Sequence, residues 1–157
     1  MVYIIAGATG VVGSAISKEL AKENEVHLIG RDEEKLSALS KEIDAQYSVI
    51  DLTNTIEQRE FSKIIPDDKE IKGLVNCIGS ILIKPLHGTK TEEFEEVLRV
   101  NLFSSYYLLS SFARRMKNGS AIFFSSVAGT KGLSNHDAIA AATAGLALSL
   151  IHISEPT

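Results

Sequence analysis

Cysteine and positive charge are both scarce in this chain of 157 residues, and each scarcity argues against a class of protein. The single cysteine, Cys77, cannot form a disulfide within the chain, so a disulfide-stapled secreted domain is excluded. Lys and Arg number 16 against 20 Asp and Glu, which gives a formal net charge of −4. Nucleic-acid binding normally needs a basic face, so we expect no nucleic-acid partner. The expected location is a reducing one, the cytoplasm.

Long apolar runs and clusters of metal ligands are also missing. No apolar stretch approaches the roughly 20 residues that cross a membrane, so we expect no membrane partner. The first residues carry no basic leader and no small-residue cleavage site, which favours a core strand over a signal peptide. The four histidines, of which His27 and His136 are two, form no zinc spacing with Cys77, so we expect no metal site.

The first thirty residues hold the most informative pattern. An apolar run over 2–6 breaks into a glycine-rich segment at 7–13, an amphipathic stretch continues to residue 20, and a second apolar run covers 26–29. This order predicts a strand, a glycine turn, a helix and a second strand. The arrangement is typical of a dinucleotide-binding unit, and the alternative is a turn that merely connects strand to helix.

Each glycine of that segment has an expected task. Gly7 can adopt the positive φ of a tight turn, Gly10 would let the main chain approach a pyrophosphate, and Gly13 would let the helix pack closely on the strand. The amide groups and the positive dipole end of the new helix would then face the anion. A nucleoside-triphosphate P-loop is disfavoured because no Gly-Lys-Ser/Thr follows.

Strand and helix patterns alternate through the rest of the chain. Strands are predicted over 46–50, 71–78 and 121–124, and helices over 33–43, 55–65 and 138–150. A long helix ending at Asn118-Gly119 begins either at Thr89, in a capping box with Glu92, or at Thr91. The segments 80–88 and 129–135 are interpreted as irregular. Alternation of this kind predicts an α/β fold with a parallel sheet and right-handed crossovers.

Residues at the predicted strand ends suggest the cofactor. Gly30 and Arg31 follow the second strand, where an arginine suits the 2′-phosphate of NADP and a carboxylate suits the ribose of NAD. This favours NADP over NAD, although the adjacent carboxylate, Asp32, is also a natural N-cap, and Arg31 could simply be a solvated side chain. Asp51 lies where a carboxylate could contact the adenine edge.

Polar residues elsewhere leave two interpretations open. Asn101 falls on the apolar face of the long helix and is either a bridge between elements or a site residue. Ser125 and Ser126 follow the fifth strand, at the sheet edge where the chemistry of this architecture is found. Cys77 lies in a predicted strand and is interpreted as a core residue.

These motifs together resemble the short-chain dehydrogenase/reductase family. They are the glycine turn 7–13, Gly30-Arg31, Asp51-Leu52-Thr53, Asn76-Cys77-Ile78-Gly79, Val100-Asn101 and the run 124–129. The resemblance implies a Rossmann-like, doubly wound parallel sheet in three layers, with strand order 3-2-1-4-5, over residues 1–147. It further implies an NADP-dependent oxidoreductase that moves hydride between nicotinamide and a small carbonyl or alcohol substrate, acting as a homo-oligomer. The implied cofactor-binding residues are Gly7, Thr9, Gly10, Val11, Val12, Gly13, Arg31, Asp51, Leu52, Asn76, Cys77, Ile78, Gly79 and Thr143.

The resemblance also implies a catalytic set that is only half present. Asn101 would hold a water in a proton relay, and Ser126 would polarise the substrate oxygen or, alternatively, only cap the strand end. The family's Tyr-x-x-x-Lys motif falls on Ile139 and Thr143, so the usual acid and its lysine are absent. His136 is a candidate substitute acid, or a plain helix-start residue.

Two alternatives remain, the first favoured by the absent tyrosine and lysine and the second by the glycine-rich turn between strand and helix. One is a catalytically dead dinucleotide-binding sensor or interaction module. The other is a methyltransferase-like nucleotide binder, against which Arg31 and the serines at 125–126 argue.

The last ten residues, 148–157, resemble the translation of a sequencing-library adapter and are expected to be a non-native tail. Relatives would continue past the last helix, so the fold is expected to be incomplete at its C-terminal end, with an exposed apolar edge at the fifth strand.

Overall fold

The structure is a computed structural model that describes residues 1–54 and 61–150. Backbone contacts divide the chain into two units. The first holds Met1–Ile78 and Tyr107–Phe123, and the second holds Gly79–Tyr106 and the residues from Phe124 onward. One domain over 1–147, followed by a non-native tail, remains a prediction, and residues 151–157 of that tail lie outside the described residues.

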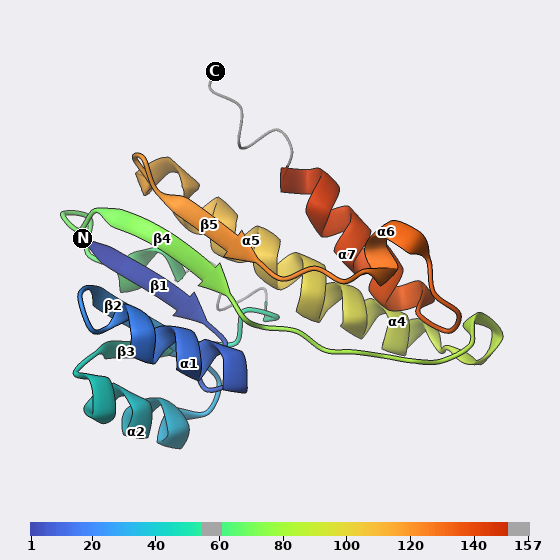
Figure 1. Cartoon of the computed structure of the whole chain (residues 1–157), viewed down its shortest axis with the longest axis horizontal. Helices are drawn as coiled ribbons and strands as arrows, with labels where there is room; N and C mark the ends of the chain where they lie inside the picture. The colour runs from blue at the N-terminus through green and yellow to red at the C-terminus, as the bar shows by residue number, and fades with distance from the viewer. Residues whose placement is uncertain (55–60, 151–157) are drawn as a thin grey trace. The chain divides into compact units, whose positions relative to one another are not determined.

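The first unit is built on a parallel sheet (Figure 1). Its strands are ordered β3-β2-β1-β4-β5, which confirms the predicted order and the α/β class. The strands are β1 (Val2–Ala6), β2 (Glu25–Gly30), β3 (Gln46–Val49), β4 (Ile71–Asn76) and β5 (Ser120–Phe123). The fourth strand ends two residues before the predicted boundary because the Asn76 side chain accepts a hydrogen bond from the Ile78 amide at 3.0 Å and turns the chain.

The register of the strands aligns their carboxyl ends. Ala6 pairs with Ile29 on one side and with Asn76 on the other, and Asn76 in turn pairs with Phe123. Parallel strands in this register present the segments that follow β1, β2 and β4 at one edge of the sheet. Most of the predicted cofactor residues of the first unit occupy those segments, while Asp51 and Leu52 follow β3 and Asn76 is the last residue of β4.

Helices cover both faces of the sheet. On one face, α1 (Val11–Leu20) and α2 (Glu33–Ile43) pack through a core that includes Leu28 and Leu36. On the other face lies the part of α5 (Ser104–Phe112) that belongs to this unit (Figure 1). Ile4 and Ile5 point to opposite faces and are both fully buried, as expected of a strand that is covered on two sides. The predicted three layers are therefore present.

The segment between β3 and β4 differs from its prediction. Of the helix predicted over 55–65, residues 55–60 lie outside the described residues, and 62–64 form a single 3₁₀ turn, η1 (Ser62–Ile64). The Arg115 guanidinium, in the turn η4 (Ala113–Arg115), donates to the carbonyls of Ser62 and Ile65 at 3.2 and 2.9 Å. This long-range anchor holds the segment in a turn, and local sequence pattern does not reveal it.

The second unit is helical. Its elements are η2 (Leu86–Gly88), α4 (Thr91–Leu98), the π-turn η3 (Arg99–Phe103), the start of α5, α6 (Ala128–Lys131) and α7 (Asp137–Leu150). A small apolar core joins α4, α6 and α7 through Val97, Ala128, Ala138, Ile139 and Ala142. No helix among the described residues has the length and apolar character needed to cross a membrane.

Three expectations for this unit were wrong. The long helix is interrupted at η3 and its α-helical part ends at Phe112, and the predicted irregular segment 129–135 begins within α6. Neither threonine is the N-cap, because that position belongs to Lys90, whose amide donates to the Glu93 carboxylate at 2.9 Å. The hydroxyl of Thr89 instead donates to the Pro85 carbonyl at 3.2 Å.

Candidate functional site

The glycine turn between β1 and α1 has the conformation that the sequence predicts. Gly7 has a φ of +72°, and a Cβ on it would lie 2.9 Å from both the Cys77 carbonyl carbon and the Ile78 amide nitrogen. The turn is closed by the Gly10 amide, which donates to the Gly7 carbonyl at 3.1 Å. Gly7 therefore meets two requirements that only glycine satisfies, a positive φ and close approach to the end of β4.

Gly13 fixes the start of α1 against this turn. A Cβ on Gly13 would lie 2.2 Å from the Gly7 carbonyl oxygen, so the predicted close packing of helix on strand is confirmed. Helix α1 begins at Val11, whose side chain is 92% exposed, next to the half-exposed Val12. Amides of a first helical turn have no partner within their own helix, and they attract anions. The exposed backbone here suits a phosphate-bearing ligand.

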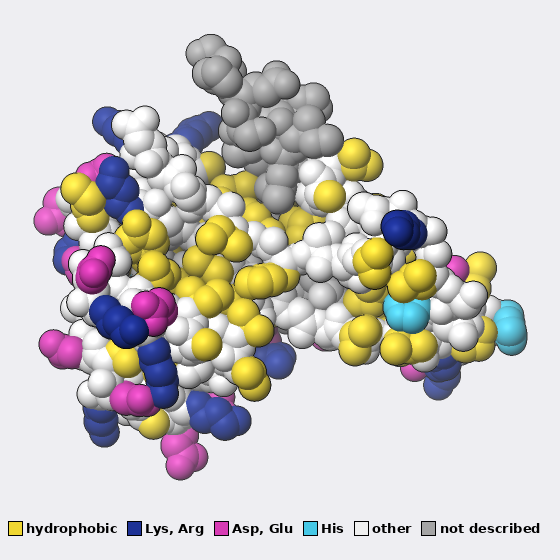
Figure 2. All heavy atoms as spheres, in the orientation of Figure 1, with side chains coloured by type: hydrophobic (Ala, Val, Ile, Leu, Met, Phe, Trp, Pro, Cys, Tyr) yellow, Lys and Arg dark blue, Asp and Glu magenta, His cyan; other side chains and the backbone are white. Residues whose placement is uncertain are grey.

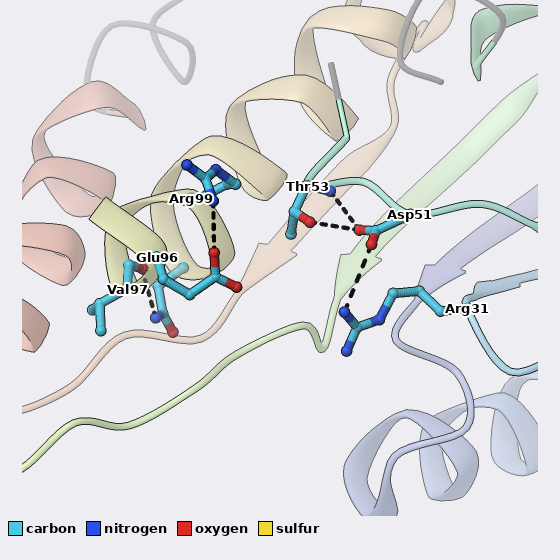
Figure 3. Close-up of polar contacts among 7 residues, drawn as sticks. Arg31, Asp51, Thr53, Glu96, Val97 and Arg99 are labelled. Atoms are coloured by element: carbon cyan, nitrogen blue, oxygen red, sulfur yellow. Dashed lines mark hydrogen bonds and ion pairs between the residues drawn. The ribbon is translucent and has the colours of Figure 1, made fainter. Parts of the chain in front are cut away.

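Arg31 lies beside Asp51 at the ends of β2 and β3 (Figure 3). The guanidinium Nη1 is 3.6 Å from Asp51 Oδ2, and the arginine side chain is 73% exposed. The other carboxylate oxygen of Asp51 accepts from the amide and hydroxyl of Thr53 at 2.8 and 2.7 Å. Burial raises the pKa of Asp51, but the hydrogen bonds from Thr53 and the charge of Arg31 outweigh it and leave this pKa below its usual value. Leu52, which lies between Asp51 and Thr53 in sequence, is buried.

Asp32 caps α2, as predicted. Its Oδ1 accepts from the Lys35 amide at 3.0 Å and its Oδ2 lies 2.8 Å from Lys35 Nζ. Hydrogen bonds from Lys35 lower the pKa of Asp32. Both carboxylate oxygens are thus turned toward the helix.

The segment that follows β4 lies directly beside the glycine turn. Asn76 is buried, and the Cys77 amide donates to the Ala6 carbonyl at 2.8 Å. The Cys77 side chain is half-buried against the core under α1 and α2, and burial raises its thiol pKa to about 11. Cys77 is therefore a packing residue whose thiol stays protonated at neutral pH. Ile78 ends the first unit, and Gly79 begins the second.

Asn101 lies in the π-turn of the second unit and joins it to the segment after Gly79. Its Oδ1 accepts from the Ser80 amide at 3.1 Å, and its Nδ2 donates to the Ser80 hydroxyl at 3.2 Å and to the Val97 carbonyl at 2.9 Å. Asn101 therefore bridges two elements, and its role as a site residue stays a prediction. Sequence reasoning missed Ser80, because no local pattern signals a contact across 21 residues.

Ser126 and His136 lie in the same unit. The Ser126 hydroxyl oxygen accepts from the Ala128 amide at 3.2 Å and begins the turn into α6. His136 Nδ1 lies 2.7 Å from the Ser134 carbonyl oxygen. Because a carbonyl can only accept, Nδ1 carries the proton and Nε2 carries the lone pair of the neutral ring. His136 is half-buried just before α7, so the geometry suits a proton donor or acceptor at Nε2.

The two positions at which the family resemblance predicts a tyrosine and a lysine are buried. Ile139 is 4% exposed within the core of the second unit, and Thr143 is 5% exposed. The Thr143 hydroxyl donates to the Ile139 carbonyl at 2.7 Å. A Cβ on Gly129 would lie 2.6 Å from the Thr143 hydroxyl oxygen. Helix α6 therefore packs closely against α7 at Thr143. Neither side chain offers a titratable proton.

Apolar side chains are exposed on the second unit. Ile81, Ile83, Leu86 and Leu133 are each more than two-fifths exposed, and Figure 2 shows hydrophobic side chains on the surface of this unit. The two segments that carry them are joined, because the Lys84 amide donates to the Asn135 carbonyl at 2.8 Å. No group of three or more His, Cys, Asp or Glu side chains that could hold a metal occurs among residues 1–54 and 61–150.

Comparisons with known proteins agree with this geometry. The family described as short chain dehydrogenase matches residues 1–151. A 3-oxoacyl-[acyl-carrier-protein] reductase FabG from Rickettsia bellii is 30% identical over 149 residues, which cover 91% of this chain and 61% of that protein. A tropinone reductase homolog from Arabidopsis thaliana is 30% identical over 84% of this chain and 54% of its own length.

Solved structures extend the likeness to the fold. A metagenomic short-chain oxidoreductase in complex with NADP superposes with a TM-score of 0.88 at 31% identity, and covers 97% of this chain and 74% of that one. The chain spans about three-fifths of the length of the first curated relatives that it matches. The glycine turn, the strand order and these matches together place the chain in the short-chain dehydrogenase family, whose members have an NAD(P)-binding Rossmann fold.

Proposed function

We propose that this chain is the cofactor-binding part of an NADP-dependent oxidoreductase that moves hydride between nicotinamide and a carbonyl or alcohol substrate. The observation that carries the proposal is the turn from Gly7 to Gly13, with its positive φ and its close approach to β4. The residues present fit a dinucleotide. The exposed first turn of α1 would bind the pyrophosphate through the amides of Val11 and Val12. Thr9, Gly10 and Gly79 remain proposed cofactor contacts.

The preference for NADP over NAD rests on Arg31 and Asp32. The Arg31 guanidinium is largely exposed and its ion pair with Asp51 is long, at 3.6 Å, so it can turn toward a 2′-phosphate. The Asp32 carboxylate, which could otherwise bind the ribose of NAD, is held by Lys35. Asp51 is proposed to contact the adenine edge while it keeps its bonds to Thr53.

The chemistry would divide among three residues of the second unit. When bound, the nicotinamide would supply or accept the hydride. The Ser126 hydroxyl would donate to the substrate oxygen. The doubly protonated imidazolium of His136 would give that oxygen its proton from Nε2 during reduction and would keep the Nδ1 hydrogen on the Ser134 carbonyl, and the neutral ring would take the proton back at Nε2 during oxidation. The Asn101 region would hold a water of the proton relay. Thr143 is proposed to stand at the position of the nicotinamide-binding lysine, without its charge.

The second candidate is a dinucleotide-binding sensor or interaction module without turnover. The burial of Ile139 and Thr143 favours it, because these positions carry the family's acid and its lysine. General acid–base catalysis typically raises a reaction rate by roughly 10²- to 10⁴-fold, so a chain without the tyrosine acid and its lysine would turn over far more slowly.

The experiment that separates the two candidates is turnover. The purified chain is supplied with NADPH and with a panel of ketones and aldehydes whose apolar portion increases in length, because Ile81, Ile83 and Leu133 offer an apolar surface. Oxidation of NADPH that saturates with one of these carbonyls supports the oxidoreductase. Saturable NADPH binding with no oxidation across the panel supports the sensor.

Two further parts of the proposal concern location, which rests on the single cysteine, and assembly, which comes from the family resemblance. The protein would act in the cytoplasm, where the single thiol of Cys77 stays reduced, and it would assemble as a homo-oligomer. Its substrate and partners would be small molecules and copies of itself.

A further inference from the structure

The π-turn η3 separates two α-helical segments in the second unit. It spans Arg99–Phe103, and the amide of Ser104 donates to the carbonyl of Arg99, five residues earlier. A π-turn has poorer geometry than α-helix, is rare, and occurs mostly at functional sites. Something in the surrounding structure must therefore hold it in place.

The side chain of Asn101, at the centre of this turn, makes three hydrogen bonds. One hydrogen of Nδ2 goes to the Val97 carbonyl at 2.9 Å, and the other goes to the Ser80 hydroxyl at 3.2 Å. Oδ1 accepts from the Ser80 amide at 3.1 Å. Both hydrogens of the side-chain amide are thereby used.

The polarity of these partners allows only one orientation of the amide. A rotation by half a turn would set the Asn101 NH₂ against the Ser80 amide hydrogen and its oxygen against the Val97 carbonyl oxygen. Both contacts would be repulsive, so Ser80 and Val97 together define which end of Asn101 points where. Of these two partners, Ser80 is the one that meets both ends of the amide, because it offers a donor and an acceptor.

Neighbouring serines reinforce the turn. The Ser104 hydroxyl donates to the Val100 carbonyl at 2.6 Å, and the Ser105 hydroxyl donates to the Asn101 carbonyl at 3.2 Å. A carbonyl oxygen has two lone pairs, so the Asn101 carbonyl can accept a second hydrogen bond, such as one from water. The direction of that carbonyl depends on the π-turn that the Asn101 side chain holds.

We propose that Ser80 is a positioning residue: its hydroxyl fixes the Asn101 amide and, through it, the π-turn that aims the Asn101 carbonyl. The inference rests on the proposed function in one respect, the relay water that the Asn101 carbonyl would hold. The hydrogen bonds of Ser80 do not depend on that function. A buried hydroxyl must find a partner in the protein, but Ser80 is exposed and its hydroxyl could bind water instead. Its hydrogen bond with Asn101 is therefore not explained by burial.

The test is the hydrogen-exchange rate of the Asn101 side-chain NH₂, measured by NMR. Ser80→Ala removes the hydroxyl and keeps the amide, and Ser80→Thr restores a hydroxyl. Ser110→Ala is the matched control, because that hydroxyl donates only to the Tyr107 carbonyl, at 3.2 Å, on exposed helix surface. We expect exchange about tenfold faster in Ser80→Ala, close to wild type in Ser80→Thr, and unchanged in Ser110→Ala. Unchanged exchange in Ser80→Ala would overturn the proposal.

NADPH affinity, measured on the same samples, separates this inference from the proposed function. We expect faster exchange in Ser80→Ala with an unaltered NADPH dissociation constant and, on any carbonyl that is reduced, a lower kcat at unchanged KM for NADPH. A wild-type chain that fails to bind NADPH would contradict the proposed function, and the exchange rates would still decide the role of Ser80. A parallel loss of NADPH affinity in Ser80→Ala would contradict the positioning role.

Discussion

The two units of this chain depart from their family to very different extents. In the first, the features that suit a dinucleotide are properties of the main chain: the φ of Gly7, the contact of Gly13 and the exposed amides at the start of α1. In the second, the family resemblance predicts a tyrosine and a lysine at positions 139 and 143, and the residues there, Ile139 and Thr143, are buried and have no titratable side chain. The difference suggests that binding and chemistry are separable here.

The largest expected effect is on turnover and comes from a substitution in the second unit. If His136 supplies the proton, His136→Asn lowers kcat by roughly 10²- to 10⁴-fold on any carbonyl that the chain reduces, and leaves NADPH affinity unchanged. Steady-state kinetics and a binding titration measure the two quantities. His87→Asn is the matched control, because His87 is an exposed histidine in the turn η2. Equal losses in both variants, or none in His136→Asn, would contradict the assignment.

The next effect is in the first unit and concerns stability. Gly13→Ala places a Cβ 2.2 Å from the Gly7 carbonyl oxygen, so α1 must shift away from β1. We expect the free energy of unfolding to fall by about 3 kcal/mol or more. Gly10→Ala is the control, since its Cβ would approach the same oxygen only to 3.4 Å. Urea unfolding of both variants measures the difference, and equal midpoints would show that the turn is not tightly packed.

A buried histidine in β2 makes the stability of the first unit depend on pH. His27 donates to or accepts from the Ser48 hydroxyl at 2.9 Å, and burial lowers its pKa to about 4, while the charge of Glu25 opposes that shift. The folded state thus keeps His27 neutral between pH 6.5 and 4, where the unfolded chain takes up a proton.

The free energy of unfolding should therefore be fully retained above pH 6.5 and fall by up to about 3 kcal/mol as the pH drops to 4. Urea unfolding at a series of pH values measures it, with His27→Val as the comparison. The variant should lose most of the dependence between pH 6.5 and 5, above the range in which carboxylates titrate. An identical pH profile in the variant would contradict the burial of a neutral His27.

The smallest expected effect concerns cofactor choice. Arg31→Ala removes the guanidinium proposed for the 2′-phosphate, so NADPH should bind about tenfold more weakly while NADH affinity changes little. Lys22→Ala, which removes an exposed cation paired with Glu19, controls for net charge. Equal loss of both cofactors would show that Arg31 does not discriminate between them.

The sequence predicted most of the first unit because its signals are local. Alternating strands and helices, the spacing of Gly7 and Gly13, and Asp32 before α2 each follow from neighbouring residues, and the structure bears them out. The family resemblance added the strand order. The exception is the segment 62–64, where Arg115, about fifty residues away, binds the carbonyls.

The second unit was predicted less well because its features depend on contacts between distant residues. The hydrophobic spacing from Phe94 to Leu109 indicated one continuous helix, but the Asn101 side chain takes the Val97 carbonyl and a π-turn results. Ser80 had no signal in the sequence at all. The roles of Ser126, His136 and Thr143 remain predictions, since hydrogen bonds alone do not assign a reaction.

A calorimetric titration of the chain with NADPH, repeated with NADH, tests the central claim most directly. The account predicts saturable binding of one NADPH per chain, about tenfold tighter than NADH, whether or not any carbonyl is reduced. A chain that is folded by circular dichroism and binds neither cofactor would contradict it.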